Sequence, residues 1–251
     1  MDINYFENRV EVGGLRFHQV FGADSQTAEA NYPDFILVKS KKMIDCYFDR
    51  FKDIKIDDFL ELGVLRGGSV AFFNETLKPA RHLAIDIHAT AAEPLAHMES
   101  RAKNAGRQLA CNLSTSQSDI PGIKKAYSEQ FGREAEFDVI IDDASHFYDL
   151  TLASFNGLFP LVKPGGIYVI EDWGWGQWAP FQEKSNQLYN EPALSNIIHY
   201  CTLGCSSGAA GISRVDITLD SVFIHRDEKP LPEDYAVEKA FPLRGREYVP
   251  L

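Results

Sequence analysis

Apolar residues fall in short runs, separated by longer and partly polar segments, over most of the chain. Runs typical of buried strands occupy residues 59–62, 83–85, 109–111, 139–141 and 167–170. The intervening segments have the length and apolar spacing of helices and lie near 67–77, 91–104, 120–131 and 150–161. Strands that alternate with helices predict a parallel sheet, doubly wound through right-handed crossovers.

The C-terminal part departs from this alternation. Apolar runs at 215–219 and 222–224 are separated by Asp220 and Ser221, which predicts an antiparallel hairpin. We therefore expect an α/β fold: a doubly wound, mostly parallel seven-stranded sheet of the Rossmann-like kind that ends in a C-terminal antiparallel hairpin.

The first 55 residues are less regular. A short strand pair is expected around residues 10–20, and the apolar positions from Pro33 to Phe51 are close to helical spacing. We accordingly expect an N-terminal helical region at 1–55 and a main domain at 56–251.

Charge and apolar content restrict the partners. The formal net charge of −11 argues against nucleic acid, whose phosphates favour a basic surface, but leaves room for a small anionic substrate at a locally positive site. No apolar run approaches the ~20 residues that span a bilayer, so no membrane association is expected. The first residues lack the basic and apolar regions of a signal peptide, and we expect a cytoplasmic protein.

The end of the first predicted parallel strand carries a glycine-rich pattern, E-x-G-x-x-x-G-G-S, from Glu61 to Ser69. A dinucleotide fingerprint needs glycine two positions after Gly63, where this chain has Leu65, which disfavours a nicotinamide oxidoreductase. The second strand ends at Asp86, about 20 positions after the glycines, the distance expected for a carboxylate that binds a ribose. A carboxylate there can accept both ribose hydroxyls, so Asp86 is the expected ribose ligand.

Carboxylates follow the fourth and fifth strands. Asp143 ends one run and Glu171 and Asp172 end the next, and adjacent parallel strand ends lie close together. Three converging carboxylates suit an oxygen-preferring cation such as Mg²⁺ or Mn²⁺. His146, three residues after Asp143, has the pKa range of a general base for a substrate hydroxyl.

These blocks carry a family resemblance. IIDDASH at 140–146, SF at 154–155, LFP at 158–160 and PGGIYVIED at 164–172 resemble class I S-adenosylmethionine-dependent methyltransferases, and among them the magnesium-dependent sugar O-methyltransferases of natural-product pathways. Those enzymes act on deoxysugars of macrolides and related glycosides or on nucleotide-activated rhamnose. The same block is similar to the cephalosporin hydroxylase family. The resemblance covers residues 58–173 well and the tail in outline.

The resemblance implies S-adenosylmethionine and Mg²⁺ (or Mn²⁺) as cofactors, a small sugar or glycoside acceptor and a homo-oligomer. Its metal ligands fall on Asp143, Glu171 and Asp172, and its base falls on His146, so His146 and Asp143 are the candidate catalytic residues. Candidate cofactor-binding residues are Glu61, Gly63, Arg66, Gly67, Ser69, Asp86, Ile87, Gln117 and Asp142. By the same resemblance Ser69 caps the following helix, Gln117 faces the adenine, and fold analogy makes residues 21–42 a lid. One departure is Ser116, where the family often has Asp before Gln.

Alternatives stay open at this stage. The paired aspartates suit helix capping or surface ion pairs, and His146 suits capping or packing. The tryptophans at 173, 175 and 178 suit either an acceptor platform or the packing of a loop. A catechol-type O-methyltransferase also places metal carboxylates at these strand ends, and a non-catalytic cofactor-binding accessory protein would need no base.

Overall fold

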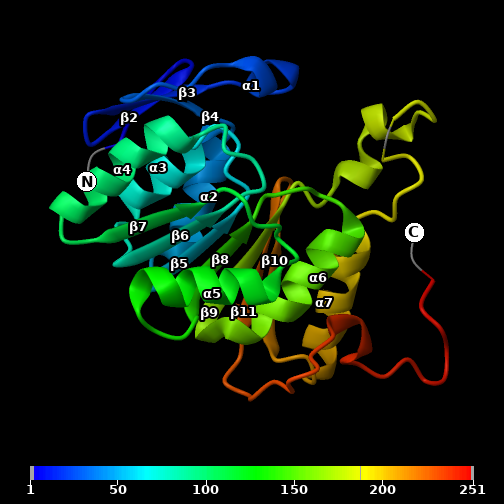
Figure 1. The fold of residues 1–251 in the computed structure, drawn as a ribbon. Coiled ribbons are helices and arrows are strands. Elements are labelled where there is room, and N and C mark those ends of the chain that lie inside the picture. The colour runs from blue at the N-terminus through cyan, green and yellow to red at the C-terminus, as the bar shows by residue number, and fades with distance from the viewer. Residues whose placement is uncertain (1–2, 187, 250–251) are drawn as a thin grey trace. The chain divides into compact units, whose positions relative to one another are not determined.

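The structure is a computed structural model that describes residues 3–186 and 188–249 (Figure 1). It divides the chain into two units. The first consists of Met1–Ser116 and Gly122–Ala135, and the second consists of Gln117–Pro121 and Glu136–Leu251. None of the described helices has the length and apolar character needed to span a bilayer.

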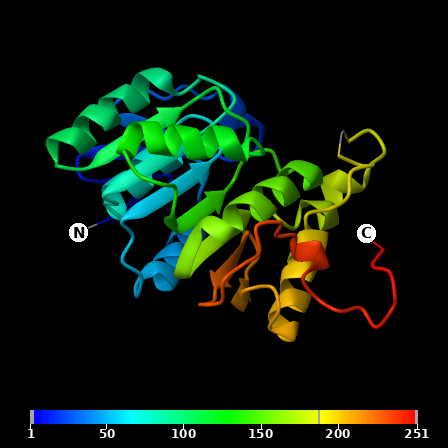
Figure 2. The same cartoon turned by 60° about the horizontal axis from the view of Figure 1, so that its bottom comes forward.

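The first unit contains a run of parallel strands with helices on both faces. Figures 1 and 2 show α3 and α4 on one side of these strands and most of α5 on the other. The strands pair in the order β5-β6-β7, and the register sets Leu62 opposite Ile85 and Ile85 opposite Asn112, so their carboxyl ends are level. The elements are β5 (Asp58–Leu62), α3 (Gly68–Thr76), β6 (Arg81–Ile85), α4 (Ala92–Asn104), β7 (Gln108–Asn112) and α5 (Ile120–Phe131).

A second, smaller sheet also belongs to the first unit. It has the order β1-β2-β3-β4, and α3 packs against β2 and β4. Its strands are β1 (Asn4–Phe6), β2 (Arg9–Val12), β3 (Leu15–Gln19) and β4 (Asp34–Leu37), and two helices accompany them, α1 (Ala23–Thr27) and α2 (Lys41–Phe51). The strand pair expected around residues 10–20 is confirmed.

The helical expectation for residues 33–51 is wrong in its first half. Residues Asp34–Leu37 form β4, which pairs in parallel with β3, and Phe35 and Leu37 are fully buried. A continuous buried run of this length suits a strand as well as a helix, and the pairing with β3 decides between them. The helix begins at Lys41, where Ser40 is the N-cap and its hydroxyl accepts a bond from the Met43 amide. The boundary after residue 55 and the lid role of 21–42 stay predictions.

The second unit contains four paired strands in the order β10-β11-β9-β8. β8 and β9 are parallel, whereas β11 is antiparallel to both β9 and β10, as the predicted hairpin requires. α7 packs against β10. The elements are β8 (Phe137–Asp142), α6 (Tyr148–Leu158), β9 (Val162–Glu171), α7 (Ser195–Ser207), β10 (Ile212–Ile217) and β11 (Ser221–Arg226), with short 3₁₀ helices η1 (Phe159–Leu161), η2 (Trp175–Gln177), η3 (Ala179–Gln182) and η4 (Val237–Lys239).

The predicted fold class is confirmed. Seven strands, β5 to β11, make a mostly parallel sheet in an α/β fold. Each of the five predicted parallel runs lies within a strand, because a parallel strand buried on both faces needs a continuous apolar run. Most of the candidate site residues lie at or just after the carboxyl ends of these strands, where ligands bind in open α/β sheets.

Candidate functional site

The glycine-rich loop after β5 has three residues with a left-handed backbone, Gly63, Leu65 and Gly67, and Leu65 has φ 50°. Gly63 has φ 91° and Gly67 has φ 80°, a region in which a side chain is strained. α3 begins at Gly68 with Gly67 as its N-cap, and no side chain caps it. The expectation that Ser69 caps this helix is therefore wrong: Ser69 lies inside the first turn, since the glycine turn already ends at Gly67.

Asp86 ties this loop to the end of β6. Its Oδ2 accepts the N–H of Val64 at 2.8 Å and of Leu65 at 3.2 Å, and its Oδ1 accepts the N–H of His88 at 2.8 Å. Each carboxylate oxygen has more than one acceptor direction, and the side chain is half-buried. Asp86 thus fixes the loop and keeps acceptor capacity for a ligand hydroxyl.

Glu61 is fully buried near the end of β5. Its Oε2 lies 3.4 Å from Nε2 of His82, which is also fully buried, but the geometry makes no hydrogen bond. Neither carboxylate oxygen has a hydrogen-bond partner among the described residues. A buried acceptor without a donor is costly, which makes Glu61 a position where a ligand donor or cation would be stabilised.

The other predicted cofactor residues of the first unit differ in exposure. Arg66 is half-buried in the loop, whereas the Ile87 side chain, directly after Asp86, is 59% exposed. An exposed apolar side chain beside a polar loop is consistent with a ligand contact, although single exposed apolar residues are common.

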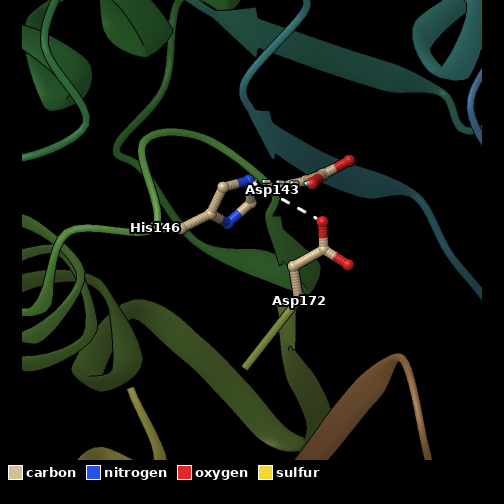
Figure 3. A group of neighbouring side chains, drawn as sticks. All are labelled: Asp143, His146 and Asp172. Atoms are coloured by element: carbon tan, nitrogen blue, oxygen red, sulfur yellow. Dashed lines mark ion pairs between the residues drawn. The ribbon is translucent and has the colours of Figure 1, made fainter. Parts of the chain in front are cut away.

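In the second unit, Asp143, His146 and Asp172 come together (Figure 3). One ligand atom from each lies within 4.8 Å of the others. His146 Nε2 is 3.9 Å from Asp143 Oδ1 and 4.0 Å from Asp172 Oδ2, and all three side chains are partly exposed. The register explains the meeting: Asp142 lies opposite Ile170 on β9, so the residues that follow both strands emerge at the same edge.

Two of these residues have a left-handed backbone. His146 has φ 58° and Asp172 has φ 50°, which costs a residue with a Cβ about 1–3 kcal/mol. Such conformations persist when surrounding contacts determine them. The Asp172 N–H donates to the carbonyl of Asp220, and Trp175 Nε1 donates to the carbonyl of His146 over 3.0 Å.

Glu171 is not brought into this group. It is the last residue of β9, is 2% exposed, and lies opposite Ser221 of β11. Among the described residues, the third side chain that joins Asp143 and Asp172 is His146. A metal-ligand role for Glu171 stays a prediction from the resemblance.

Asp142 and Gln117 take part in a buried polar network. Asp142 Oδ2 accepts Ser154 Oγ at 2.5 Å and the Tyr168 hydroxyl at 2.8 Å, and Asp142 Oδ1 accepts Gln117 Nε2 at 3.2 Å. Burial raises the pKa of Asp142 to about 6, although the bonds from Ser154 and Tyr168 lower it. The Gln117 Oε1 accepts the N–H of Ser145, so the network reaches the loop that carries His146.

Ser154 and Tyr168 lie within the motifs that carry the family resemblance, but those motifs alone indicate no role for them. A signal was present: each is a polar residue at a core position of an apolar pattern, and both are fully buried. Buried polar groups need partners, so such positions indicate a network.

The tryptophans after β9 differ from one another. Trp175 is 3% exposed, its ring packs against Phe181, and its Nε1 donates to the His146 carbonyl. These contacts favour the alternative in which this tryptophan packs a loop over the one in which it contacts an acceptor. Trp173 Nε1 donates to the Thr218 carbonyl over 3.0 Å. Trp178 is half-buried and packs edge-on against Phe181.

Comparison with known proteins adds to this picture. Residues 60–173 match the family described as a methyltransferase domain. The chain is 46% identical over 59 residues to the demethylmacrocin O-methyltransferase of Streptomyces fradiae, which covers 24% of this chain and 15% of that protein. It is 32% identical over 117 residues to the L-olivosyl-oleandolide 3-O-methyltransferase of Streptomyces antibioticus, covering 47% of this chain and 25% of that protein.

Among solved structures, the MycE methyltransferase of the mycinamycin pathway, in complex with Mg, S-adenosylhomocysteine and mycinamycin VI, has a TM-score of 0.56 at 20% identity. The match covers 75% of this chain and 50% of that chain, and at this identity it concerns the fold. The chain spans a quarter or less of the length of the two curated relatives above. The predicted resemblance to class I S-adenosylmethionine-dependent methyltransferases, and among them to sugar O-methyltransferases of antibiotic pathways, is confirmed, and the family match lies at residues 60–173.

Proposed function

We propose that this protein is a metal-assisted O-methyltransferase that transfers the methyl group of S-adenosylmethionine to a sugar hydroxyl of a glycoside or nucleotide sugar. The observation that carries the proposal is the group formed by Asp143, His146 and Asp172: two carboxylates and one imidazole at adjacent strand ends of a methyltransferase domain. Such a group combines cation ligands with a general base.

The residues of the first unit fit the cofactor. S-adenosylmethionine carries a sulfonium and an amino group, and Glu61 is a buried carboxylate whose oxygens have no hydrogen-bond partner among the described residues. Asp86 retains acceptor capacity for ribose hydroxyls beside the backbone turn at Gly63 and Gly67. Arg66, Ser69 and Ile87 complete the proposed cofactor residues of this unit.

The donor set in the second unit fits a hard divalent cation. Asp143 and Asp172 would hold Mg²⁺ or Mn²⁺, with Glu171 as the further ligand that the resemblance implies. A bound cation supplies positive charge that lowers the cost of forming an alkoxide.

His146 is the proposed base. Its Nε2 would accept the proton of the acceptor hydroxyl, whose oxygen forms the new bond to the methyl carbon as the carbon–sulfur bond breaks. S-adenosylhomocysteine and a methyl ether are the products. Much of the rate enhancement would come from alignment of oxygen, carbon and sulfur, and the fixed loop around His146 supports this.

A glycosidic acceptor is supported by the relatives. Their names refer to a macrocin and an olivosyl oleandolide, and the MycE complex contains mycinamycin VI. The acceptor, its hydroxyl and the pathway are proposals at the level of this chemical class. A homo-oligomeric state and a cytoplasmic location remain predictions from the sequence.

The test uses labelled S-adenosylmethionine with two acceptor panels, deoxysugar glycosides with vicinal hydroxyls and flat diphenols, each with Mg²⁺ or with EDTA. We expect label on glycosides, with Mg²⁺ only. Asp143→Asn should abolish transfer, whereas the matched control Asp149→Asn, an exposed carboxylate in the first turn of α6, should keep it.

Each other outcome has a definite meaning. Label on diphenols alone would favour the catechol-type alternative. Cofactor binding without transfer to either panel would favour the accessory-protein alternative. Transfer that persists in EDTA and in Asp143→Asn would remove the metal from the proposal.

A further inference from the structure

The loop that carries Asp143 and His146 is held by two hydrogen bonds from side chains outside it. The Ser145 N–H donates to Gln117 Oε1 over 3.0 Å, and Trp175 Nε1 donates to the His146 carbonyl over 3.0 Å. The two bonds act on the backbone of successive residues. Both anchors and the loop belong to the second unit.

The backbone at His146 needs such support. Its φ of 58° lies in the left-handed region, which a residue with a Cβ adopts when its surroundings determine it. The direction of the imidazole follows from this backbone. A bond to the His146 carbonyl therefore helps to set the distances of 3.9 and 4.0 Å between Nε2 and the two carboxylates (Figure 3).

The anchors are themselves fixed. Gln117 is 6% exposed, and its Nε2 donates to Asp142, which is held in turn by Ser154 and Tyr168. Trp175 is 3% exposed and packs against Phe181. A fully hydrogen-bonded buried network is rigid, so Gln117 and Trp175 hold the loop backbone at a fixed position relative to the core of the second unit.

We propose that Gln117 and Trp175 are positioning residues for His146 and Asp143. They hold the loop in the backbone conformation that brings the imidazole to the carboxylates of Asp143 and Asp172. For Gln117 this role differs from the adenine contact predicted by the resemblance, because both ends of its amide are engaged within the second unit. The inference rests on the proposed function for its chemical meaning.

Two variants and a matched control test it in the full chain. Gln117→Met removes both polar ends at similar volume, and Trp175→Phe keeps an aromatic ring but removes the donor. Trp173→Phe is the control, since it removes an indole bond of the same 3.0 Å length that ends on Thr218 instead of His146. Thermal unfolding first establishes that each variant folds, and Trp175→Phe carries the test by itself if Gln117→Met does not.

Three measurements are made on each protein: amide hydrogen exchange of residues 143–147 without metal, Mn²⁺ affinity by electron paramagnetic resonance, and S-adenosylhomocysteine affinity by calorimetry. We expect exchange in the loop to accelerate about tenfold or more in Gln117→Met and Trp175→Phe. Their Mn²⁺ dissociation constants should rise about 10–100-fold, as for other residues that orient metal ligands. Trp173→Phe should match wild type in loop exchange, and S-adenosylhomocysteine affinity should be unchanged in Gln117→Met.

If hydrogen exchange in the loop is at the wild-type rate in both variants, the inference is wrong, regardless of their Mn²⁺ affinities. If wild type binds Mn²⁺ and the variants exchange faster but bind Mn²⁺ equally well, the inference is also wrong. Weaker S-adenosylhomocysteine binding with normal loop exchange in Gln117→Met would return Gln117 to the cofactor role. If wild type binds no Mn²⁺ while exchange accelerates in both variants, the metal part of the proposed function fails and the positioning inference stands.

Discussion

The glycine-rich loop of the first unit and the Asp143–His146 loop of the second reach their geometry by different means. In the first, glycines occupy two of the three left-handed positions, at 63 and 67, and Leu65 occupies the third. Asp86 accepts the Leu65 N–H, and the Thr90 hydroxyl donates to the Leu65 carbonyl. In the second, His146 and Asp172 occupy left-handed positions although both have a Cβ. Contacts from Gln117, Trp175 and Asp220 hold them.

The two loops differ in how the steric cost of a positive φ is avoided or offset. A glycine accepts a positive φ without steric cost, so at 63 and 67 the first loop depends on its own residue types. Leu65 is strained, and hydrogen bonds with Asp86 and Thr90 hold it. A histidine or aspartate there is strained, and the strain is offset by hydrogen bonds from elsewhere in the chain. We therefore expect the second loop to be sensitive to changes at distant positions, and the first to changes at its two glycines as well as at Asp86 and Thr90.

The largest effect is expected for the proposed base. His146→Ala should lower turnover by about 10²–10⁴-fold, because no other group replaces the proton acceptor. The measurement is the rate of labelled methyl transfer to the glycoside that wild type accepts. S-adenosylhomocysteine affinity should stay at the wild-type value, and near-normal turnover would remove His146 from its proposed role.

The next effect separates the two regions. Asp86→Ala should weaken S-adenosylhomocysteine binding by about 10–100-fold, the amount expected when a carboxylate loses its hydrogen bonds to ligand and loop. Mn²⁺ binding in the absence of cofactor should be unaffected. Asp143→Asn should weaken Mn²⁺ binding and leave S-adenosylhomocysteine binding unaffected. Both ligands weakened together in either variant would argue against separate roles, and calorimetry and electron paramagnetic resonance measure the two affinities.

A smaller effect concerns stability. Ser154→Ala removes a fully buried donor to Asp142 and should lower the free energy of unfolding by about 1 kcal/mol, measured by urea denaturation. Ser128→Ala is the matched control, since its hydroxyl bonds to a backbone carbonyl at an exposed site, and its unfolding should match wild type. Equal stability of all three proteins would contradict a stabilising network.

The smallest effect is a pH dependence in the N-terminal sheet. Hydrogen bonding from Arg16 lowers the pKa of Asp34 to about 2, below its unfolded value. The folded state then binds fewer protons, so the stabilisation is complete above pH 4 and is lost as the pH falls toward 2. Both side chains are more than a third exposed, so Asp34→Asn should cost less than about 1 kcal/mol at pH 7.

The control for this pair is Arg16→Met. Urea denaturation between pH 7 and pH 2 should show the difference between wild type and Asp34→Asn shrinking as the pH falls. In the Arg16→Met background the same pH dependence should be weaker, because only the hydrogen bond to His18 then lowers the pKa of Asp34. A difference that grows toward low pH would have the wrong sign for a lowered pKa.

Much of the fold follows from the sequence because its signals are local. The apolar runs that became β5 to β9 are continuous, as parallel strands require, and the helices between them have clear spacing. The exception is β4, where the same buried run suits a strand or a helix and only the pairing with β3 decides. The prediction that Ser69 caps α3 is wrong because the N-cap is Gly67, two residues earlier than expected.

The sequence by itself determined the fold class, the methyltransferase resemblance and the candidate residues, because strand periodicity, glycine spacing and strand-end carboxylates are read from neighbouring positions. Only the tertiary structure decided which candidates meet. It joined His146 to Asp143 and Asp172, left Glu171 buried at the end of β9, and drew Gln117 and Asp142 into a polar network with Ser154 and Tyr168. The physical reason is that side-chain direction at a strand end depends on left-handed backbone angles and on hydrogen bonds between distant segments, which no local pattern encodes.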